Sequence, residues 1–234
     1  AASANAATDP KDVKWKNMDE ENRDFFNRAF EAKDFKDNQI GAWNQTTKRN
    51  CVSVGWIKYG MDKYGNKLFD NMTKTPNGID VTMKDGVKVK LSTDELQMTR
   101  NRANFVGKDK DALSYATVAY TAMAKRAENE GRVTYLRGGL FRGRGRTVDG
   151  FEGALMQLNN GEPTTAGAKY LGLKDKLERI STSDINRDAV ASSSGHAFFI
   201  DRIKDKSFTD RYGIPHNADI PASGRFRIND AYIL

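Results

Sequence analysis

The chain has 234 residues, of which 38% are hydrophobic and 29% are charged, a composition typical of a soluble globular protein. No apolar run approaches the roughly 20 residues that a membrane-spanning helix needs, so no membrane span is expected. Lysine and arginine number 38 against 31 for aspartate and glutamate, which gives a formal net charge of +7. Because the basic residues are spread along the whole chain, nucleic acid is not the expected partner.

The first 38 residues are expected to form an N-terminal arm or leader. Ala1 to Pro10 are small and polar, without the charged and apolar regions of a secretory signal peptide. From Lys11 to Asn38, aromatic residues such as Phe26 and Phe30 recur at helical spacing, which indicates an amphipathic helix packed on the body. The sequence leaves the location unknown; it permits a soluble cytoplasmic protein or an effector secreted without a classical signal peptide.

Cys51 is the only cysteine, so it cannot form an internal disulfide. It is either a small buried residue or a thiol kept for chemistry. Apolar residues fall on nearly every helical face from Val52 to Met61, which predicts a central, buried helix with Cys51 in its first turn. The positive end of the helix dipole favours the thiolate there, as do the basic neighbours Lys48 and Arg49. The helix start and the basic neighbours favour the interpretation of Cys51 as a nucleophile over that of a small buried residue.

Gln45 precedes this cysteine with five residues between them. Its side-chain amide can donate a hydrogen bond to a developing oxyanion, which is the group that most needs a fixed donor in acyl transfer. The stretch from Gln45 to Cys51 therefore predicts a nucleophile with its oxyanion hole.

Strand and helix patterns follow along the chain. Alternating apolar residues from Ile79 to Leu91, interrupted by an Asp-Gly turn, predict a β-hairpin. From Lys110 to Gly131 a sustained helical period predicts a long helix, with Asp109 or Asp111 as its N-cap.

Glycine and arginine dominate the next stretch, from Tyr135 to Arg146. The glycines disfavour a helix and the arginines suit phosphates or carboxylates, although a solvated loop is the simpler interpretation. Apolar residues from Val148 to Leu158 predict a short helix, and a loose polar stretch is expected from there through Leu173.

His196 is one of only two histidines and opens an apolar segment that predicts a buried strand. A residue at the start of such a strand can face a cleft. A turn then leads to a short return strand, Ser207 to Thr209, and to Asp210. The carboxylate of Asp210 could orient the ring of His196, which completes the roles of nucleophile, base and orienting group with Cys51.

These motifs resemble the papain-fold cysteine peptidases, and their layout is most similar to the protease core of the calpains. Gln45 and Cys51 match the Gln-five residues-Cys motif at the start of that family's central helix. Gly195-His196-Ala197 resembles the family's Gly-His-Ala-Tyr strand, and Asp210 to Gly213 stands where calpains carry Asn-Pro-Trp-Gly. Intervening segments also resemble the family, so that the similarity covers roughly Ala42 to Gly213.

The resemblance implies an α+β, two-lobed, papain-like fold with a helical lobe and an antiparallel β lobe. Residues 39–130 would form the helical lobe and residues 131–234 the β lobe. Gln45 and the Cys51 amide would then form the oxyanion hole, Cys51 would attack a protein substrate, His196 would transfer the proton and Asp210 would orient His196. No cofactor and no metal is implied.

The chain also departs from the calpain pattern. Val52 stands where papains and calpains usually have tryptophan, and Asp210 replaces asparagine, as is familiar in bacterial effector peptidases of the papain clan. No acidic cluster resembles an EF-hand loop, so calcium dependence is not expected.

Three alternatives remain open from the sequence. A papain-like deamidase or transglutaminase would use the same triad with a different acceptor. A mono-ADP-ribosyltransferase is suggested by Arg137 with Ser181-Thr182-Ser183, but Glu178 is the last glutamate, so that family's C-terminal catalytic glutamate is missing. A non-catalytic binding module would use the stretch from Arg137 to Arg146 to hold nucleic acid or an acidic protein.

Overall fold

A computed structural model describes residues 12–33, 35, 43–45, 50–131, 135–137, 146–159, 163–182, 185, 187–193, 196–201, 207–209, 215–217 and 228–234. Within these, residues 43–45, 135–137, 146–148, 196, 207–209 and 215–217 are described by their backbone alone. The described part combines helices with antiparallel sheets, which confirms the α+β class.

The elements up to residue 131 are mostly helical. They are α1 (Glu20–Glu31), β1 (Trp43–Gln45), α3 (Cys51–Tyr64), the 3-10 turn η1 (Gly65–Lys67), β2 (Asn71–Thr75), β3 (Gly78–Thr82), β4 (Lys88–Ser92), α4 (Thr93–Ala103), β5 (Phe105–Gly107) and α5 (Lys110–Asn129).

Strands predominate in the remainder. The elements are β6 (Tyr135–Arg137), β7 (Arg146–Val148), α6 (Gly150–Gln157), α7 (Thr164–Tyr170), the 3-10 turn η2 (Lys174–Lys176), β8 (Glu178–Ile180), β9 (Ala189–Ser193), β10 (His196–Asp201), β11 (Ser207–Thr209), β12 (Pro215–Asn217) and β13 (Ile228–Ile233).

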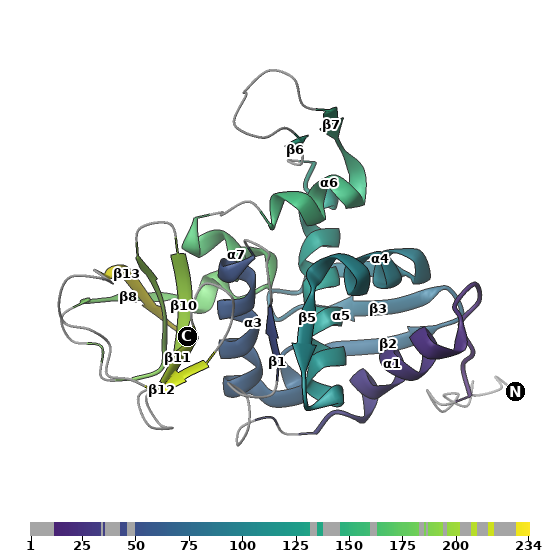
Figure 1. Ribbon diagram of the computed structural model, residues 1–234, viewed down its shortest axis with the longest axis horizontal. Helices are drawn as coiled ribbons and strands as arrows, with labels where there is room; N and C mark the ends of the chain where they lie inside the picture. The colour runs from purple at the N-terminus through teal and green to yellow at the C-terminus, as the bar shows by residue number, and fades with distance from the viewer. Residues whose placement is uncertain are drawn as a thin grey trace, which may run out of the picture.

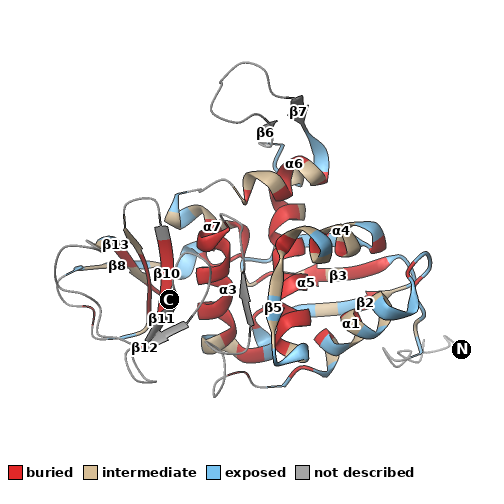
Figure 2. Cartoon of the chain, in the orientation of Figure 1, coloured by how far each residue is buried: buried red, intermediate tan, exposed pale blue. Residues whose placement is uncertain are grey.

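The helix α3 lies at the centre of the molecule. Figure 1 shows it between a six-stranded sheet on one side and α5 with the three-stranded sheet β2-β3-β4 on the other. Every residue from Cys51 to Met61 is buried, and α5 is buried along most of its length (Figure 2). The central, buried helix expected behind Cys51 is therefore confirmed.

Side-chain caps fix where three of the helices begin. The carboxylate of Asp109 accepts hydrogen bonds from the backbone N–H groups of Asp111 and Ala112 at the start of α5. At the start of α4, Ser92 and Glu95 form a capping box, in which each side chain accepts from the other's backbone N–H. At the start of α1, the Asp19 carboxylate accepts from the backbone N–H of Asn22 at 2.8 Å. Such caps satisfy N–H groups that have no partner within the helix.

The six-stranded sheet is antiparallel throughout, with the strand order β12-β11-β10-β9-β13-β8. One face of β9 and β10 packs on α3, where Val190 and Phe199 join the main core. Alternate residues such as Ala191 and Phe198 belong to a smaller core on the other face. This alternation follows from the period of two along a strand, and it makes the sheet buried on both faces around β10.

Most of the expected elements are confirmed. The hairpin from Ile79 to Leu91 is the β3–β4 pair, the long helix begins at Lys110, and the return strand is β11. The loose polar stretch expected before Leu173 is wrong in part, because α7 forms there from Thr164. Past residue 131, α6 and α7 pack on α5, and the six-stranded sheet starts only at Glu178.

A glycine allows α7 to approach α3 closely. A Cβ built at Gly167 would lie 2.6 Å from Trp56 Cδ1 and 2.8 Å from Val52 Cγ1. The indole Nε1 of Trp56 also donates to the Thr164 carbonyl at 2.6 Å, so that the two helices are joined at this crossing.

Gly167→Ala is expected to destabilise the protein by about 1–3 kcal/mol, because overpacking forces α7 away from α3. The matched control is Gly55→Ala in α3, whose Cβ would meet its nearest atoms at 3.6–3.7 Å, an ordinary contact. It should be neutral or stabilise by up to ~1 kcal/mol through helix propensity. Urea denaturation midpoints measure both, and equal effects of the two changes would contradict the close crossing.

Candidate functional site

Cys51 is the first residue of α3, with 9% of its surface exposed. The first turn of the helix contains no acidic residue that would oppose the positive end of the dipole. The thiol therefore lies at the positive end of the helix dipole, on a helix that is held on several sides by the core. Lys48 and Arg49 lie outside the described residues.

The strand β10 packs against α3, and two contacts fix how they are aligned. A Cβ at Gly55 would lie 3.7 Å from the peptide atoms that join Phe198 to Phe199, and 3.6 Å from Val190 on β9. Val190 is also the register partner of Phe199. Gly55 is therefore level with the middle of β10.

One turn further along α3, Tyr59 marks a second level. Its ring stacks on Phe199 with centroids 5.2 Å apart, and its hydroxyl donates to the Asp188 carbonyl at 3.0 Å. Asp188 precedes Ala189, which pairs with Ile200 near the far end of β10. Burial raises the pKa of Tyr59 to about 12, so the hydroxyl stays protonated and keeps this bond. The helix α3 and the strand β10 thus run in the same direction.

His196 is the first residue of β10, and its side chain lies outside the described residues. One helical turn back from Gly55 is about 6 Å, and the same rise along a strand takes about two residues. Starting from the level shared by Gly55 and Phe198, moving back by this distance reaches Cys51 on the helix and His196 on the strand. The backbone of His196 therefore lies at the same end of the helix–sheet contact as Cys51.

Gln45 is the last residue of β1, and only its backbone is described. It pairs with Phe105, the first residue of β5, in a two-stranded antiparallel ribbon. Beside this ribbon, Asn50 donates from Nδ2 to the Ala103 carbonyl at 3.5 Å. Since Asn50 is the N-cap of α3, the ribbon that carries Gln45 is linked to the end of the helix that carries Cys51.

Asp210 lies outside the described residues. The strand before it, β11, pairs antiparallel with β10 through Phe208 and Ile200. It therefore runs back toward the end of the sheet at which β10 begins. The second histidine, His216, is on β12 and pairs with Phe208, so that β11 separates its strand from β10.

Lys58 is a buried lysine that the sequence patterns do not single out. It is fully buried in α3, and burial lowers its pKa to about 7. It stands two turns after Cys51 and so shares its helical face. The sequence signal for it is a lysine flanked by apolar and aromatic residues within the segment that predicts a buried helix.

The described residues of the ADP-ribosyltransferase resemblance lie on or next to two different sheets. Arg137 is the last residue of β6, which pairs only with β7 among the described strands. Ser181 and Thr182 follow β8 at the edge of the six-stranded sheet, and Ser183 lies outside the described residues. Most of the arginine and glycine stretch, residues 138–145, also lies outside them.

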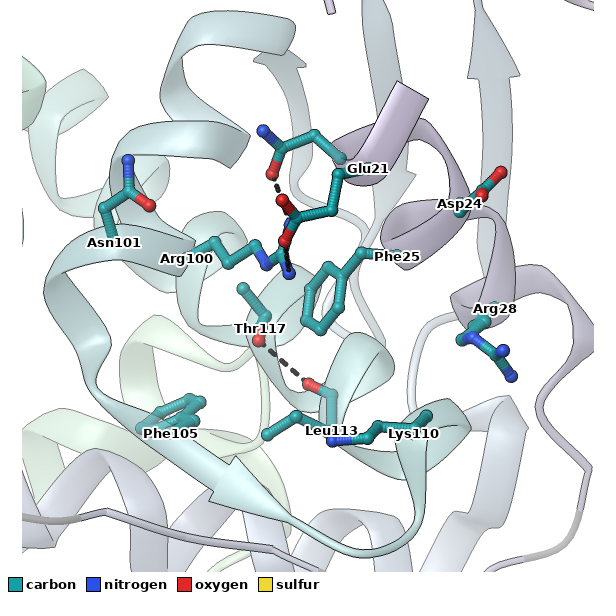
Figure 3. Close-up of a pocket in the computed structure, with 11 residues that line it drawn as sticks. Glu21, Asp24, Phe25, Arg28, Arg100, Asn101, Phe105, Lys110, Leu113 and Thr117 are labelled. Atoms are coloured by element: carbon teal, nitrogen blue, oxygen red, sulfur yellow. Dashed lines mark hydrogen bonds and ion pairs between the residues drawn. The ribbon is translucent and has the colours of Figure 1, made fainter. Parts of the chain in front are cut away.

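A polar pocket of about 500 Å³ opens among α1, α4, β5 and α5 (Figure 3). Arg100 crosses it, with its guanidinium 4.2 Å from the Phe25 ring and a 2.8 Å ion pair to Glu21. Neither Cys51 nor any residue of β10 lines it. Phe105 forms part of its wall, so the pocket adjoins the ribbon that carries Gln45.

The described part of the chain contains no group of three or more histidine, cysteine, aspartate or glutamate side chains placed to hold a metal ion. None of its helices is both long and apolar enough to cross a membrane.

Comparisons of the chain with protein-family models, with curated proteins and with solved structures give no match.

Proposed function

We propose that the protein is a thiol hydrolase that cleaves peptide bonds of protein substrates through a papain-like Cys-His-Asp triad. The observation that carries this proposal is the parallel alignment of α3 with β10, because it brings Cys51 and the backbone of His196 to one end of the helix–sheet contact. A thiol and an imidazole donated by two separate elements at such a junction form the core of a nucleophilic site.

The chemical steps follow from the residue types. The Cys51 thiolate attacks the substrate carbonyl carbon, and the resulting oxyanion accepts hydrogen bonds from the Gln45 amide and the Cys51 backbone N–H. Protonated His196 gives its proton to the leaving amine, and a thioester remains on Cys51. His196 then removes a proton from water, which attacks the thioester and releases the acid. Asp210 orients the imidazole during both steps.

Deamidation or transamidation would begin with the same thioester. In a deamidase the substrate amide is a glutamine side chain and water is the acceptor, whereas in a transglutaminase an amine is the acceptor. The arrangement around Cys51 supports thioester formation, and the three products differ in ways that mass spectrometry separates.

Alkylation of Cys51 tests whether it is a nucleophile. Because the chain has one cysteine, any thiol alkylation that is measured comes from Cys51. Although the thiol is 9% exposed, we expect iodoacetamide to modify it faster in the native protein than in the urea-unfolded chain at pH 7, since the thiolate is the reactive form. A peptidyl epoxide should react in the same way, and His196→Ala should slow both. A native Cys51 that reacts more slowly than the unfolded one would refute the proposal.

A further inference from the structure

We propose that Asn50 is a positioning residue that fixes Cys51 relative to the strand pair β1–β5, and thereby relative to Gln45. This inference rests on the proposed function. Asn50 immediately precedes Cys51, and its side chain is completely buried. It stands at the N-cap of α3 but makes no side-chain cap hydrogen bond, so its amide has a use other than capping the helix.

The amide of Asn50 instead reaches the end of α4. Its Nδ2 donates to the carbonyl of Ala103, the last residue of α4, at 3.5 Å. The chain turns immediately afterwards at Asn104, whose φ of 53° lies in the left-handed region that asparagine tolerates. Phe105 then begins β5. The hydrogen bond from Asn50 therefore links the N-terminus of α3 to the turn from which β5 starts.

The strand β5 transmits this position to Gln45. Phe105 pairs with Gln45 across the ribbon, and its ring lies 5.4 Å from the ring of Tyr120 in the buried helix α5. The ribbon is thus anchored on the core at Phe105, two residues from the carbonyl that Asn50 binds. Through these contacts, the side-chain amide of Asn50 links α3, which carries Cys51, to β1, which carries Gln45.

Asn50 is costly to stability. Its hydrogen bond is at the long limit, and its buried Oδ1 has no hydrogen-bond partner among the described residues. A buried polar atom without a partner costs about 1–3 kcal/mol. An apolar side chain of similar size would avoid that cost, and residues that lower stability in this way are expected at functional sites.

Asn50→Leu tests the inference, because a positioning role and a purely structural role predict opposite combinations of results. We expect the denaturation midpoint to stay equal or rise while kcat falls roughly 10- to 100-fold, the order expected when a catalytic group is misplaced by about 1 Å. The alkylation rate of Cys51 should change little, since alkylation needs no oxyanion donor. Hydrogen exchange of the β1–β5 amides should become faster, with α5 unaffected.

A double-mutant cycle that combines Asn50→Leu with Gln45→Ala measures whether Asn50 acts on turnover through Gln45. Gln45→Ala alone should lower turnover on the order of 10²-fold. In that background, Asn50→Leu should cost less than about 2-fold, because the group that it positions is already gone. Ser53→Ala is the matched control, since the Ser53 hydroxyl is also buried without a hydrogen-bond partner in the described part and makes no link to β5. It should leave turnover unchanged.

Unchanged turnover in Asn50→Leu, or additive effects in the cycle, would overturn the inference and leave the proposed function intact. If Asn50→Leu does not fold, Asn50→Ala takes its place in the same measurements. Failure of the proposed function has a different signature, in which wild-type Cys51 shows neither enhanced alkylation nor turnover.

Discussion

Replacing Cys51 by alanine is expected to lower turnover of protein substrates by about 10⁴-fold or more, the order of loss measured when a catalytic nucleophile is removed. The chain has no second cysteine that could substitute. The change deletes a single sulfur atom at the first position of α3, where alanine is the best helix former. Folding should therefore be retained, and the denaturation midpoint should remain close to that of the wild type.

Mass spectrometry of a proteome incubated with each protein measures this effect and also identifies the reaction. New peptide termini that depend on Cys51 indicate hydrolysis, conversion of glutamine to glutamate indicates a deamidase, and glutamine–lysine crosslinks indicate a transglutaminase. Identical products with Cys51→Ala would contradict a thiol mechanism. An NAD-dependent modification that survives the replacement would instead favour the ADP-ribosyltransferase alternative.

The long helices are predictable from the sequence because their signals are local. The helix α5 combines a sustained apolar period with a cap at Asp109, and both are visible within neighbouring residues. The helix α3 is apolar on almost every side from Cys51 onward, which only a fully buried helix tolerates.

Other elements could not be predicted because longer-range contacts determine them. The strand β13 joins the sheet between β9 and β8, far from both in sequence, and nothing near Ile228 specifies that place. The helix α7 is short, and it depends on Gly167 fitting against Trp56. For α4 a local signal existed in the capping box at Ser92 and Glu95, but it follows the strand pattern ending at Leu91 directly.

The candidate site divides in the same way. Residue types and motif spacing are enough to propose Cys51, His196 and Gln45 as candidates, because each proposed role requires a particular chemistry. Their relative placement depends on the packing of α3 against β10 and on the β1–β5 ribbon, which no local pattern encodes. The positioning role proposed for Asn50 could not be predicted from the sequence, because its hydrogen-bond partner Ala103 is remote in the chain.

The two histidines provide a test in which one is the matched control for the other. His196 begins β10, level with Cys51, whereas His216 lies on β12 and is separated from β10 by β11. His196→Ala is expected to lower turnover roughly 10²- to 10⁴-fold, the range that a general acid–base group contributes. His216→Ala should retain turnover within about 2-fold, because it removes no group that handles the proton.

Steady-state kinetics on a substrate found by mass spectrometry measures both replacements. The loss in His196→Ala should fall on kcat more than on KM, because proton transfer stabilises the transition state and not the bound substrate. Alkylation of Cys51 should slow in the same variant, since loss of the imidazolium leaves the thiolate less stabilised. An equal loss in His216→Ala, or full turnover in His196→Ala, would remove His196 from the mechanism and with it the significance of the alignment between α3 and β10.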